Sequence, residues 1–335
     1  MSNPLFRDAI GNPVFLEGMY AGGAAFLCVS GPSLLTYNLA QLRLPGIVSM
    51  GINNSPAAHA KECGDALNAW RPQLWVMTDD VASFVQSIYL DPKIIKLLPE
   101  GKSEHKLFDS DKWAFTETRV KDCPGVFYYR RNNWFQASQY LTEPTVNWGN
   151  HEDRCHCGWQ RPGKAKGTKR VKVCEQCKAN FNTMGGGRSV MLAAIRILYA
   201  LGIRTLFIVG CDMKMAEGQQ NYAFEQERHT GSINSNTKTY GLLNLRFDQL
   251  KPHFAKAGFK VYNCLETSGL RSFPFVPFNE AVDFALKGFP DVTKERTTGL
   301  YDRKRNEKLA KEAAAKLGAG DRVGFAELLA RVKRA

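Results

Sequence analysis

The chain has 335 residues, of which 44% are hydrophobic, 23% charged and 11% aromatic. This composition is typical of a globular protein and excludes a fully disordered, collagen-like or coiled-coil chain. Forty-five basic residues against 32 acidic ones give a net charge of +13, which favours polyanionic partners such as nucleic acid, nucleotides or an anionic membrane. We expect a cytoplasmic protein, because no apolar run could cross a bilayer and no secretory signal opens the chain.

Strand and helix patterns alternate along both halves of the sequence. An apolar run at residues 25–30 predicts a strand. A tight Gly-Pro-Ser turn and then a leucine-rich helix at residues 34–42 come after this strand. Further strands are predicted at residues 46–52, 74–78, 126–130, 205–210 and 260–264, further helices at 81–89, 189–201 and about 240–257, and a polar loop at 102–112. This alternation predicts an α/β fold, a Rossmann-like and mostly parallel sheet with helices on both faces.

Four segments follow from changes in composition. Residues 1–150 and 183–290 are predicted to be the two halves of one Rossmann-like domain. Residues 151–182 interrupt it as a small basic insert, and residues 291–335 form a basic helical tail. The stretch 150–180 has eight basic and three acidic residues, and the stretch 287–335 has thirteen and seven. Both are candidates for DNA contact, although a solvated helical tail explains the second equally well.

Small or polar residues follow four of the predicted strands. They are residues 30–33, Asn53 with Asn54, residues 78–80 and residues 210–212. Ligands of open parallel sheets bind beyond the carboxyl ends of the strands, where glycine lets the backbone approach a phosphate and helix N–H groups face its oxygens. The chain lacks both GxGxxG and GxxxxGK[ST], which argues against a P-loop kinase. A whole row of polar strand ends predicts a binding site better than it predicts isolated turns and caps.

Several short motifs occur in the same order as in a known group of transferases. They are Phe-Leu-Cys-Val-Ser-Gly-Pro-Ser-Leu at residues 26–34, a Gly-rich turn, Ala-rich helix and strand ending in Gly-Cys-Asp at 186–212, Asn-Tyr-Ala-Phe at 221–224 and Val-Tyr-Asn-Cys at 261–264. These motifs resemble those of the bacterial sialyltransferases of glycosyltransferase family 42 and of related proteins similar to archaeal hydroxymethylpterin diphosphokinases. The resemblance covers residues 24–90 and 183–265.

The resemblance implies a metal-independent transferase that binds a nucleotide-sugar donor of CMP or UDP type. The turn at residues 31–33 would lie along the donor phosphate, one of the two asparagines would meet the nucleotide or sugar, and the aspartate at 212 would contact the ribose or order the site. The positions expected to bind the donor are Gly31, Pro32, Ser33, Asn53, Asn54, Asp79, Gly186 and Asp212.

The resemblance also implies three catalytic positions. Tyr222 would donate its hydroxyl to the departing phosphate oxygen. Lys214 occupies the position at which the family has a second tyrosine. Its charge could serve the same leaving group, but this difference from the family leaves the identity of the donor undecided. His229 is the candidate general base, because the unperturbed pKa of histidine lies near working pH. It follows Tyr222 sooner than in the family, and a surface-loop histidine is the alternative.

Nine cysteines, an odd number, argue against a disulfide framework. Two close pairs, Cys155 with Cys157 and Cys174 with Cys177, have the spacing of a tetrahedral zinc site, which would be structural because four protein ligands leave no open position. His151 or His156 could replace one ligand, and a redox dithiol pair is the alternative. The scattered cysteines, which are Cys28, Cys63, Cys123, Cys211 and Cys264, are predicted to be buried small apolar residues.

Six cations lie between the cysteine pairs. They are Arg161, Lys164, Lys166, Lys169, Arg170 and Lys172. A metal-held knuckle of this charge fits contact with a phosphate backbone, and Trp159 beside it could stack on a base. A zinc-stapled lid or a protein-docking knob is the alternative.

Four functions therefore compete. The first is a glycosyltransferase that modifies DNA, with a hydroxymethylated pyrimidine as the acceptor. The second is a sialyltransferase-like enzyme that acts on a glycan or a small molecule. The third is a diphosphokinase with Mg²⁺ held by Asp79, Asp80 and Asp212. The fourth is a non-enzymatic nucleic-acid-binding module, which leaves the polar strand ends unexplained.

Overall fold

The computed structural model describes residues 5–44, 46–58, 70–132, 135–147, 189–223 and 230–287. The basic insert, its four paired cysteines, Trp159 and the basic tail lie outside these residues, as do Cys63, Gly186 and His229. The prediction of four segments therefore stays a prediction.

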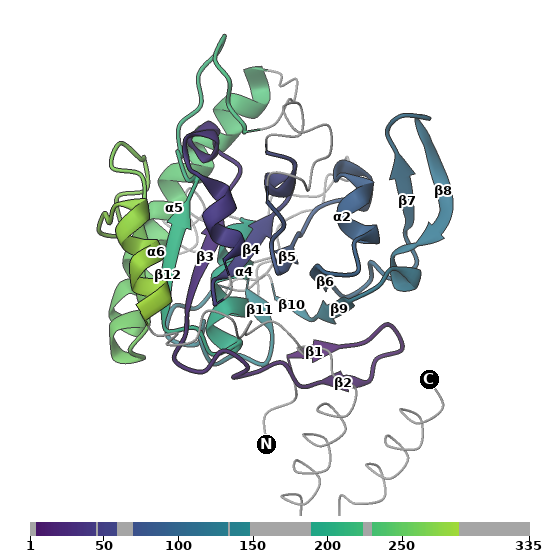
Figure 1. Ribbon diagram of the computed structural model, residues 1–335, viewed down its shortest axis with the longest axis horizontal. Helices are drawn as coiled ribbons and strands as arrows, with labels where there is room; N and C mark the ends of the chain where they lie inside the picture. The colour runs from purple at the N-terminus through teal and green to yellow at the C-terminus, as the bar shows by residue number, and fades with distance from the viewer. Residues whose placement is uncertain are drawn as a thin grey trace, which may run out of the picture.

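A nine-stranded sheet runs through the described part of the chain in the order β13-β12-β3-β4-β5-β6-β9-β1-β2 (Figure 1). Its strands are β13 (Lys260–Asn263), β12 (Thr205–Val209), β3 (Ala24–Cys28), β4 (Val48–Ile52), β5 (Leu74–Val76), β6 (Ile95–Pro99), β9 (Val126–Tyr129), β1 (Phe6–Arg7) and β2 (Pro13–Val14). The strands from β13 to β9 are parallel, and β1 and β2 extend the sheet antiparallel. The predicted α/β fold with a mostly parallel sheet is confirmed.

The order of the strands reverses beside β3. Leu27 of β3 lies opposite Met50 of β4 on one side and opposite Ile208 of β12, far along the chain, on the other. Strands that follow β3 spread away through β4, β5 and β6, whereas β12 and β13 fill the other side. Such a switch point opens a crevice at the carboxyl ends of its two central strands, here β3 and β12.

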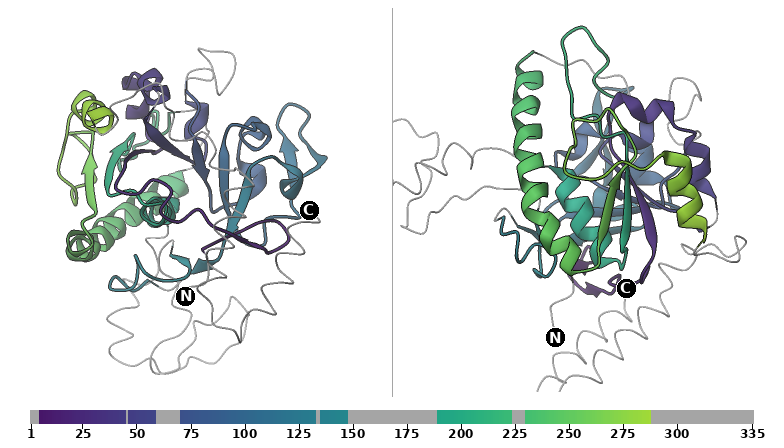
Figure 2. Two further views of the ribbon diagram at one scale, coloured as in Figure 1. Left: turned by 60° about the horizontal axis from the view of Figure 1, so that its bottom comes forward. Right: turned by 90° about the vertical axis from the view of Figure 1, so that its left-hand side faces the viewer.

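Helices cover both faces of the sheet (Figure 2). Helices α4 (Val190–Ala200) and α5 (Thr230–Lys256) lie on one face, and α6 (Phe278–Lys287) lies on the other with the 3-10 helices η1 (Pro32–Thr36) and η2 (Leu39–Arg43). Successive residues of β3 face opposite layers, since Leu27 packs in the cluster under α4, whereas Phe26 and Cys28 pack in the cluster under α6.

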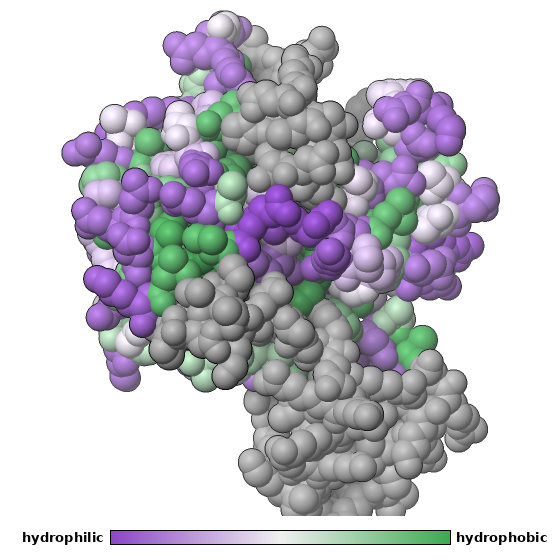
Figure 3. All heavy atoms as spheres, in the orientation of Figure 1, coloured by the Kyte–Doolittle hydropathy of each residue, from purple (hydrophilic) through white to green (hydrophobic). Residues whose placement is uncertain are grey.

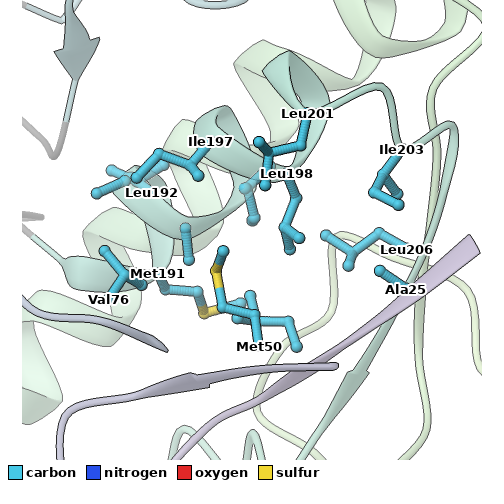
Figure 4. Close-up of a cluster of buried hydrophobic side chains, with 14 of the residues drawn as sticks. Ala25, Met50, Val76, Met191, Leu192, Ile197, Leu198, Leu201, Ile203 and Leu206 are labelled. Atoms are coloured by element: carbon cyan, nitrogen blue, oxygen red, sulfur yellow. The ribbon is translucent and has the colours of Figure 1, made fainter. Parts of the chain in front are cut away.

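Helix α4 is central because it packs on the middle of the sheet. Ser189 caps it, with its Oγ accepting the N–H of Met191 at 3.1 Å, and Gly202 follows it at a φ of 99°. Figure 4 shows Met191 and Leu198 of this helix above Met50 and Leu206 of the sheet. The rigid core therefore lies directly behind the carboxyl ends of the central strands.

Smaller elements extend the fold beyond β5. They are η3 (Ser55–Ala57), η4 (Val81–Ser83), α2 (Gln86–Leu90), the hairpin β7 (Lys106–Asp109) and β8 (Ala114–Arg119), η5 (Val120–Asp122), β10 (Arg131–Asn132) and β11 (Val146–Asn147). The hairpin projects from the domain (Figure 1), and Figure 3 shows that its surface is mostly hydrophilic. Within the described residues, no helix combines the length and apolar character that crossing a membrane requires.

Three expected elements differ in detail. The helix expected at residues 34–42 is two 3-10 helices, because the chain is extended at Tyr37 between them. The helix expected at 81–89 is likewise the 3-10 helix η4 followed by α2, with extended backbone at Phe84 and Val85. Part of the polar loop expected at 102–112 is β7, whose charged residues pair across the hairpin, as Lys106 does with Glu117 at 2.9 Å.

Candidate functional site

A cleft of about 430 Å³ opens at the carboxyl ends of β3, β4, β5 and β12. Its walls come from the loops that follow these strands and from α4 and α5. Residues from all four predicted strand ends line it, among them Gly31, Asn53, Asp79 and Asp212. The cleft therefore occupies the switch point, where the row of polar strand ends places a binding site.

The loops after β3 and β12 are joined through Asp212. Its Oδ2 accepts hydrogen bonds from the Ser33 hydroxyl at 2.6 Å and from the Ser33 backbone N–H at 3.2 Å. The N–H of Gly31 donates to the carbonyl of Gly210 at 2.8 Å. Asp212 thus orders the turn at residues 31–33, which is one of the two roles expected for it.

The structure gives a steric reason for glycine at position 31. A Cβ at Gly31 would lie 2.0 Å from Oδ2 of Asp212 and 2.6 Å from the carbonyl oxygen of Gly210. The missing side chain lets the two loops approach each other, and the expected phosphate contact of Gly31 stays a prediction. Pro32 and Ser33, at the start of η1, do not line the cleft, whereas Gly31 does.

The two asparagines after β4 differ in their surroundings. Asn54 donates from Nδ2 to the carbonyl of Ser83 at 3.0 Å and accepts the N–H of Val85 at Oδ1, at 3.1 Å. Asn53 has a φ of 50°, and its backbone carbonyl accepts the indole N–H of Trp75 at 2.7 Å. Its side-chain Oδ1 is buried without a hydrogen-bond partner among the described residues. Asn53 therefore lines the cleft with an unsatisfied but buried Oδ1, whereas Asn54 holds the neighbouring loop.

The wall opposite the β4 loop carries both described catalytic candidates. The N–H of Ala223 donates to the carbonyl of Ser30 at 3.0 Å, which fixes the segment that contains Tyr222 against the loop after β3. Asn236 of α5 donates from Nδ2 to the Tyr222 hydroxyl at 3.4 Å. Lys214 lines the same cleft, and its ammonium donates to the carbonyl of Thr267.

The structure brings together one part of the predicted site. Gly31, Asn53, Asn54, Asp79, Asp212, Lys214 and Tyr222 line one cleft. In the described ranges, no three carboxylate, thiol or imidazole side chains, Asp79, Asp80 and Asp212 included, lie close enough together to hold a metal ion by themselves. Asp80 instead accepts the N–H of Ala82 at 3.4 Å and caps η4. Gly186, His229 and the four paired cysteines lie outside the described residues, so their roles stay predictions.

Sequence reasoning missed the contribution of α4 and α5 to the cleft. Ser189, Asn236 and Tyr240 line it from these helices. The signal was the stretch at residues 230–239, in which Ile233 is the one large apolar residue and the others are small or polar. Because helix α5 begins at Thr230 rather than near Tyr240, its first turns reach the cleft.

Four of the scattered cysteines are buried, as predicted. Cys28, Cys123, Cys211 and Cys264 are free and buried. Burial raises the pKa of Cys264 to about 12 and that of Cys123 to about 11, and it raises the pKa of Cys211 well above the ordinary range of a thiol. These thiols stay protonated at neutral pH and act as small apolar residues. Cys211 lines the cleft but is not a nucleophile there.

Among known proteins, the chain has a weak structural similarity to a sialyltransferase. No protein-family profile and no curated protein sequence matches the chain. Among solved structures, the sialyltransferase CstII from Campylobacter jejuni, in complex with a substrate analogue, cytidine-5'-monophosphate, matches over 77% of this chain and 86% of that chain. The sequences are 11% identical and the TM-score is 0.38. A similarity of this size does not bear on activity or on the roles of individual residues.

Proposed function

We propose that this protein is a nucleotide-sugar-dependent glycosyltransferase. The observation that carries the proposal is a cleft at the switch point of the sheet, where Asn53 shares the walls with Lys214 and Tyr222. The two sides of the cleft supply different chemistry. Asn53 accepts hydrogen bonds, as an amino-bearing base or a sugar hydroxyl requires. Lys214 and Tyr222 offer a cation and a hydroxyl, as a phosphate leaving group requires.

The transfer step follows from this arrangement. An acceptor hydroxyl attacks the anomeric carbon of the donor sugar, a new C–O bond forms, and the bond from that carbon to the phosphate oxygen breaks. The departing oxygen gains negative charge, which the Tyr222 hydroxyl and the Lys214 ammonium stabilise more strongly in the transition state than in the ground state. The acceptor proton passes to a general base, for which we propose His229.

For the acceptor we propose a hydroxymethylated pyrimidine in DNA. Its support is the net charge of +13 and the six cations between the two cysteine pairs. A structural zinc held by Cys155, Cys157, Cys174 and Cys177 would fix these cations as one surface. Transfer to a glycan or to a small molecule is the competing proposal.

Mass spectrometry of nucleosides tests the activity. Hydroxymethylated DNA is incubated with the protein and a panel of CMP- and UDP-sugars and then digested, and we expect one nucleoside that is heavier by a sugar residue. Tyr222→Phe should slow the transfer while nucleotide affinity, measured by calorimetry, stays at the wild-type value. If no nucleotide of the panel binds the wild-type protein, the proposal is wrong. If nucleotides bind and sugar passes only to a glycan, the DNA acceptor is wrong.

A further inference from the structure

A second cleft of about 550 Å³ adjoins the first. It lies between the loop at residues 213–215, the middle of α5 and the loop at residues 269–272. Met213, Lys214 and Tyr240 line both clefts and form the border between them. A molecule in the second cleft therefore reaches the leaving-group side of the first, where Lys214 lies.

The far wall of the second cleft is held in place by Asn244. Its Nδ2 donates to the carbonyl of Gly269 at 2.9 Å, and its Oδ1 accepts the backbone N–H of Arg271 at 3.0 Å. The Ser272 hydroxyl donates to the backbone carbonyl of Asn244 at 3.0 Å. Both ends of the Asn244 amide thus hold this loop against α5, and Nδ2 also donates to the carbonyl of Tyr240 at 3.4 Å.

The same loop also holds the loop after β12. The N–H of Gly269 donates to the backbone carbonyl of Asp212 at 2.7 Å, and the Ser268 hydroxyl donates to the carbonyl of Cys211. Met213, the next residue after Asp212, has a φ of 48°. The border between the clefts is therefore a fixed and strained segment, as is common at ligand sites.

Gly241 lies on the α5 side of the second cleft. It stands inside a 27-residue helix, where glycine is less favourable than alanine. Packing gives no reason for it, because no atom lies within 4 Å of the position that a Cβ would take. The residue is exposed and lines the cleft. Because glycine has no side chain, nothing projects from the helix into the cleft at this position, which leaves room for a bound molecule.

The charges of the second cleft favour an anion. Asp248 is paired with Lys251 at 3.4 Å. Lys214 and Arg271 supply two cations, and Arg271 is exposed and has no ion-pair partner in the described part of the chain. A guanidinium without a partner is suited to bidentate contact with a phosphate.

We propose that the second cleft seats the acceptor, with its reacting hydroxyl at the border residues Lys214 and Tyr240 and an adjacent phosphate on Arg271. This assignment rests on the proposed function, since it requires a donor in the first cleft. It names the acceptor class as a phosphate-bearing molecule with a primary hydroxyl. Gly241 determines how large a group fits beside the helix.

Two probes test the clefts separately by calorimetry. Cytidine monophosphate probes the first cleft, and a 5'-phosphorylated dinucleotide of 5-hydroxymethyldeoxycytidine probes the second. We expect Gly241→Leu to weaken dinucleotide binding about tenfold or more and to leave cytidine monophosphate binding unchanged, because the leucine fills only the second cleft. Gln249→Ala, at an exposed position of the same helix outside both clefts, should change neither affinity.

The phosphate contact has its own test. Arg271→Gln should weaken binding of the phosphorylated dinucleotide about tenfold and leave binding of the nucleoside 5-hydroxymethyldeoxycytidine, which carries no phosphate, unchanged. If Gly241→Leu fails to fold, as circular dichroism would show, Gly241→Ala and Arg271→Gln carry the test, since alanine favours the helix.

Each remaining outcome decides one assignment. The second cleft is not the acceptor site if the wild-type protein binds the nucleotide but not the dinucleotide. The same conclusion follows if Gly241→Leu leaves dinucleotide binding intact. In both cases the assignment of the donor site to the first cleft stands. Failure of the wild type to bind any nucleotide overturns the proposed function itself. Tighter binding of 3'-sialyllactose than of the dinucleotide, lost in Gly241→Leu, overturns the phosphate assignment in favour of an acidic glycan.

Discussion

Two adjacent asparagines with the same side chain have different tasks in this protein. Asn54 uses both ends of its amide to hold Ser83 and Val85, whereas the Oδ1 of Asn53 is buried without a partner in the described structure. A buried acceptor without a partner is unfavourable until a ligand donates to it.

Substitution should separate these tasks. Asn53→Gly removes the amide and keeps the φ of 50° without strain, so we expect an unchanged melting temperature and nucleotide binding about tenfold weaker. Asn54→Ala should behave in the opposite way, with a loss of about 1 kcal/mol of stability, because two hydrogen bonds are lost at a half-buried site. Thermal melts and calorimetry with the nucleotide check both variants. Equal losses of affinity in the two would contradict the division.

A second residue-scale prediction concerns Asp212 and Ser33. Because the Ser33 hydroxyl donates to a carboxylate at 2.6 Å, a double-mutant cycle of Asp212→Ala and Ser33→Ala should give a coupling of about 1.5 kcal/mol in urea unfolding. Asp79→Ala is the matched control, since this exposed cleft carboxylate is not bonded to Ser33, and its effect should add to that of Ser33→Ala. Coupling near zero for Asp212 would show that the two loops are joined by other contacts.

At the scale of single elements, β6 contains a fully buried lysine. Lys96 donates from its ammonium to the carbonyls of Asp91 and of Pro124, the latter at 2.7 Å. It thereby ties β6 to the segment that leads into β9. Burial lowers its pKa from 10.5 to about 8, although the nearby Asp91 opposes the shift.

The lowered pKa predicts a pH-dependent contribution to stability. Between pH 8 and 10.5 the unfolded chain holds the Lys96 proton and the folded chain does not, so this lysine's contribution rises with pH in that window. The difference in unfolding free energy between wild type and Lys96→Met should therefore move in favour of the wild type by about 3 kcal/mol at most between pH 7 and 10. Urea titrations at the two pH values measure it. Using the difference cancels the titration of buried thiols and tyrosines, and a constant difference would contradict the shifted pKa.

The elements in which apolar residues recur at a clear spacing were predictable from the sequence. The elements whose form involves contacts between distant segments were not. The apolar face of α4 and its Ser189 cap are local features, and that helix lies where the sequence indicates it. The 3-10 helix η1 begins beside the bond from Ser33 to Asp212, a contact between loops far apart in the sequence that no local pattern contains. The start of α5 was missed because its first turns have no apolar stripe, so only their place beside the cleft explains them.

The same distinction applies to the site. Polar residues at the strand ends predicted its location, because parallel strands place those ends at one edge of the sheet. The sequence could not say which asparagine holds the neighbouring loop, nor that Asp212 occupies the space beside Gly31. Both features depend on the backbone conformation of the loops, and the residue types alone do not distinguish one role from the other.

For the whole molecule, polymer binding and chemistry should separate. Replacing Lys164, Lys166, Lys169 and Arg170 with alanine should lower DNA affinity and flatten the salt dependence of log K by about 0.9 for each lost contact on duplex DNA. Nucleotide binding in the first cleft should stay unchanged, since Gly31, Asn53 and Lys214 are untouched. Binding measured across a range of salt concentrations tests this. An unchanged slope would show that the basic insert does not hold the polymer.

Zinc gives a second prediction at this scale. Metal analysis of the purified protein should find one zinc per chain, because the four paired cysteines have tetrahedral spacing. Cys174→Ser should lose that zinc, whereas Cys28→Ser, at a free buried thiol of the sheet, should retain it. Zinc retained in Cys174→Ser would remove that residue from the ligand set.

The pairing of β3 with β12 also has a consequence for synthesis on the ribosome. Phe26, Leu27 and Cys28 of β3 are fully buried, and their partner on one side is Phe207 to Val209. A nascent chain that has emerged only to residue 200 can pair β3 with β4 but leaves its other edge open and apolar. Such an edge is a template for association with other chains. Premature termination before β12 would therefore release an aggregation-prone fragment rather than a smaller folded protein.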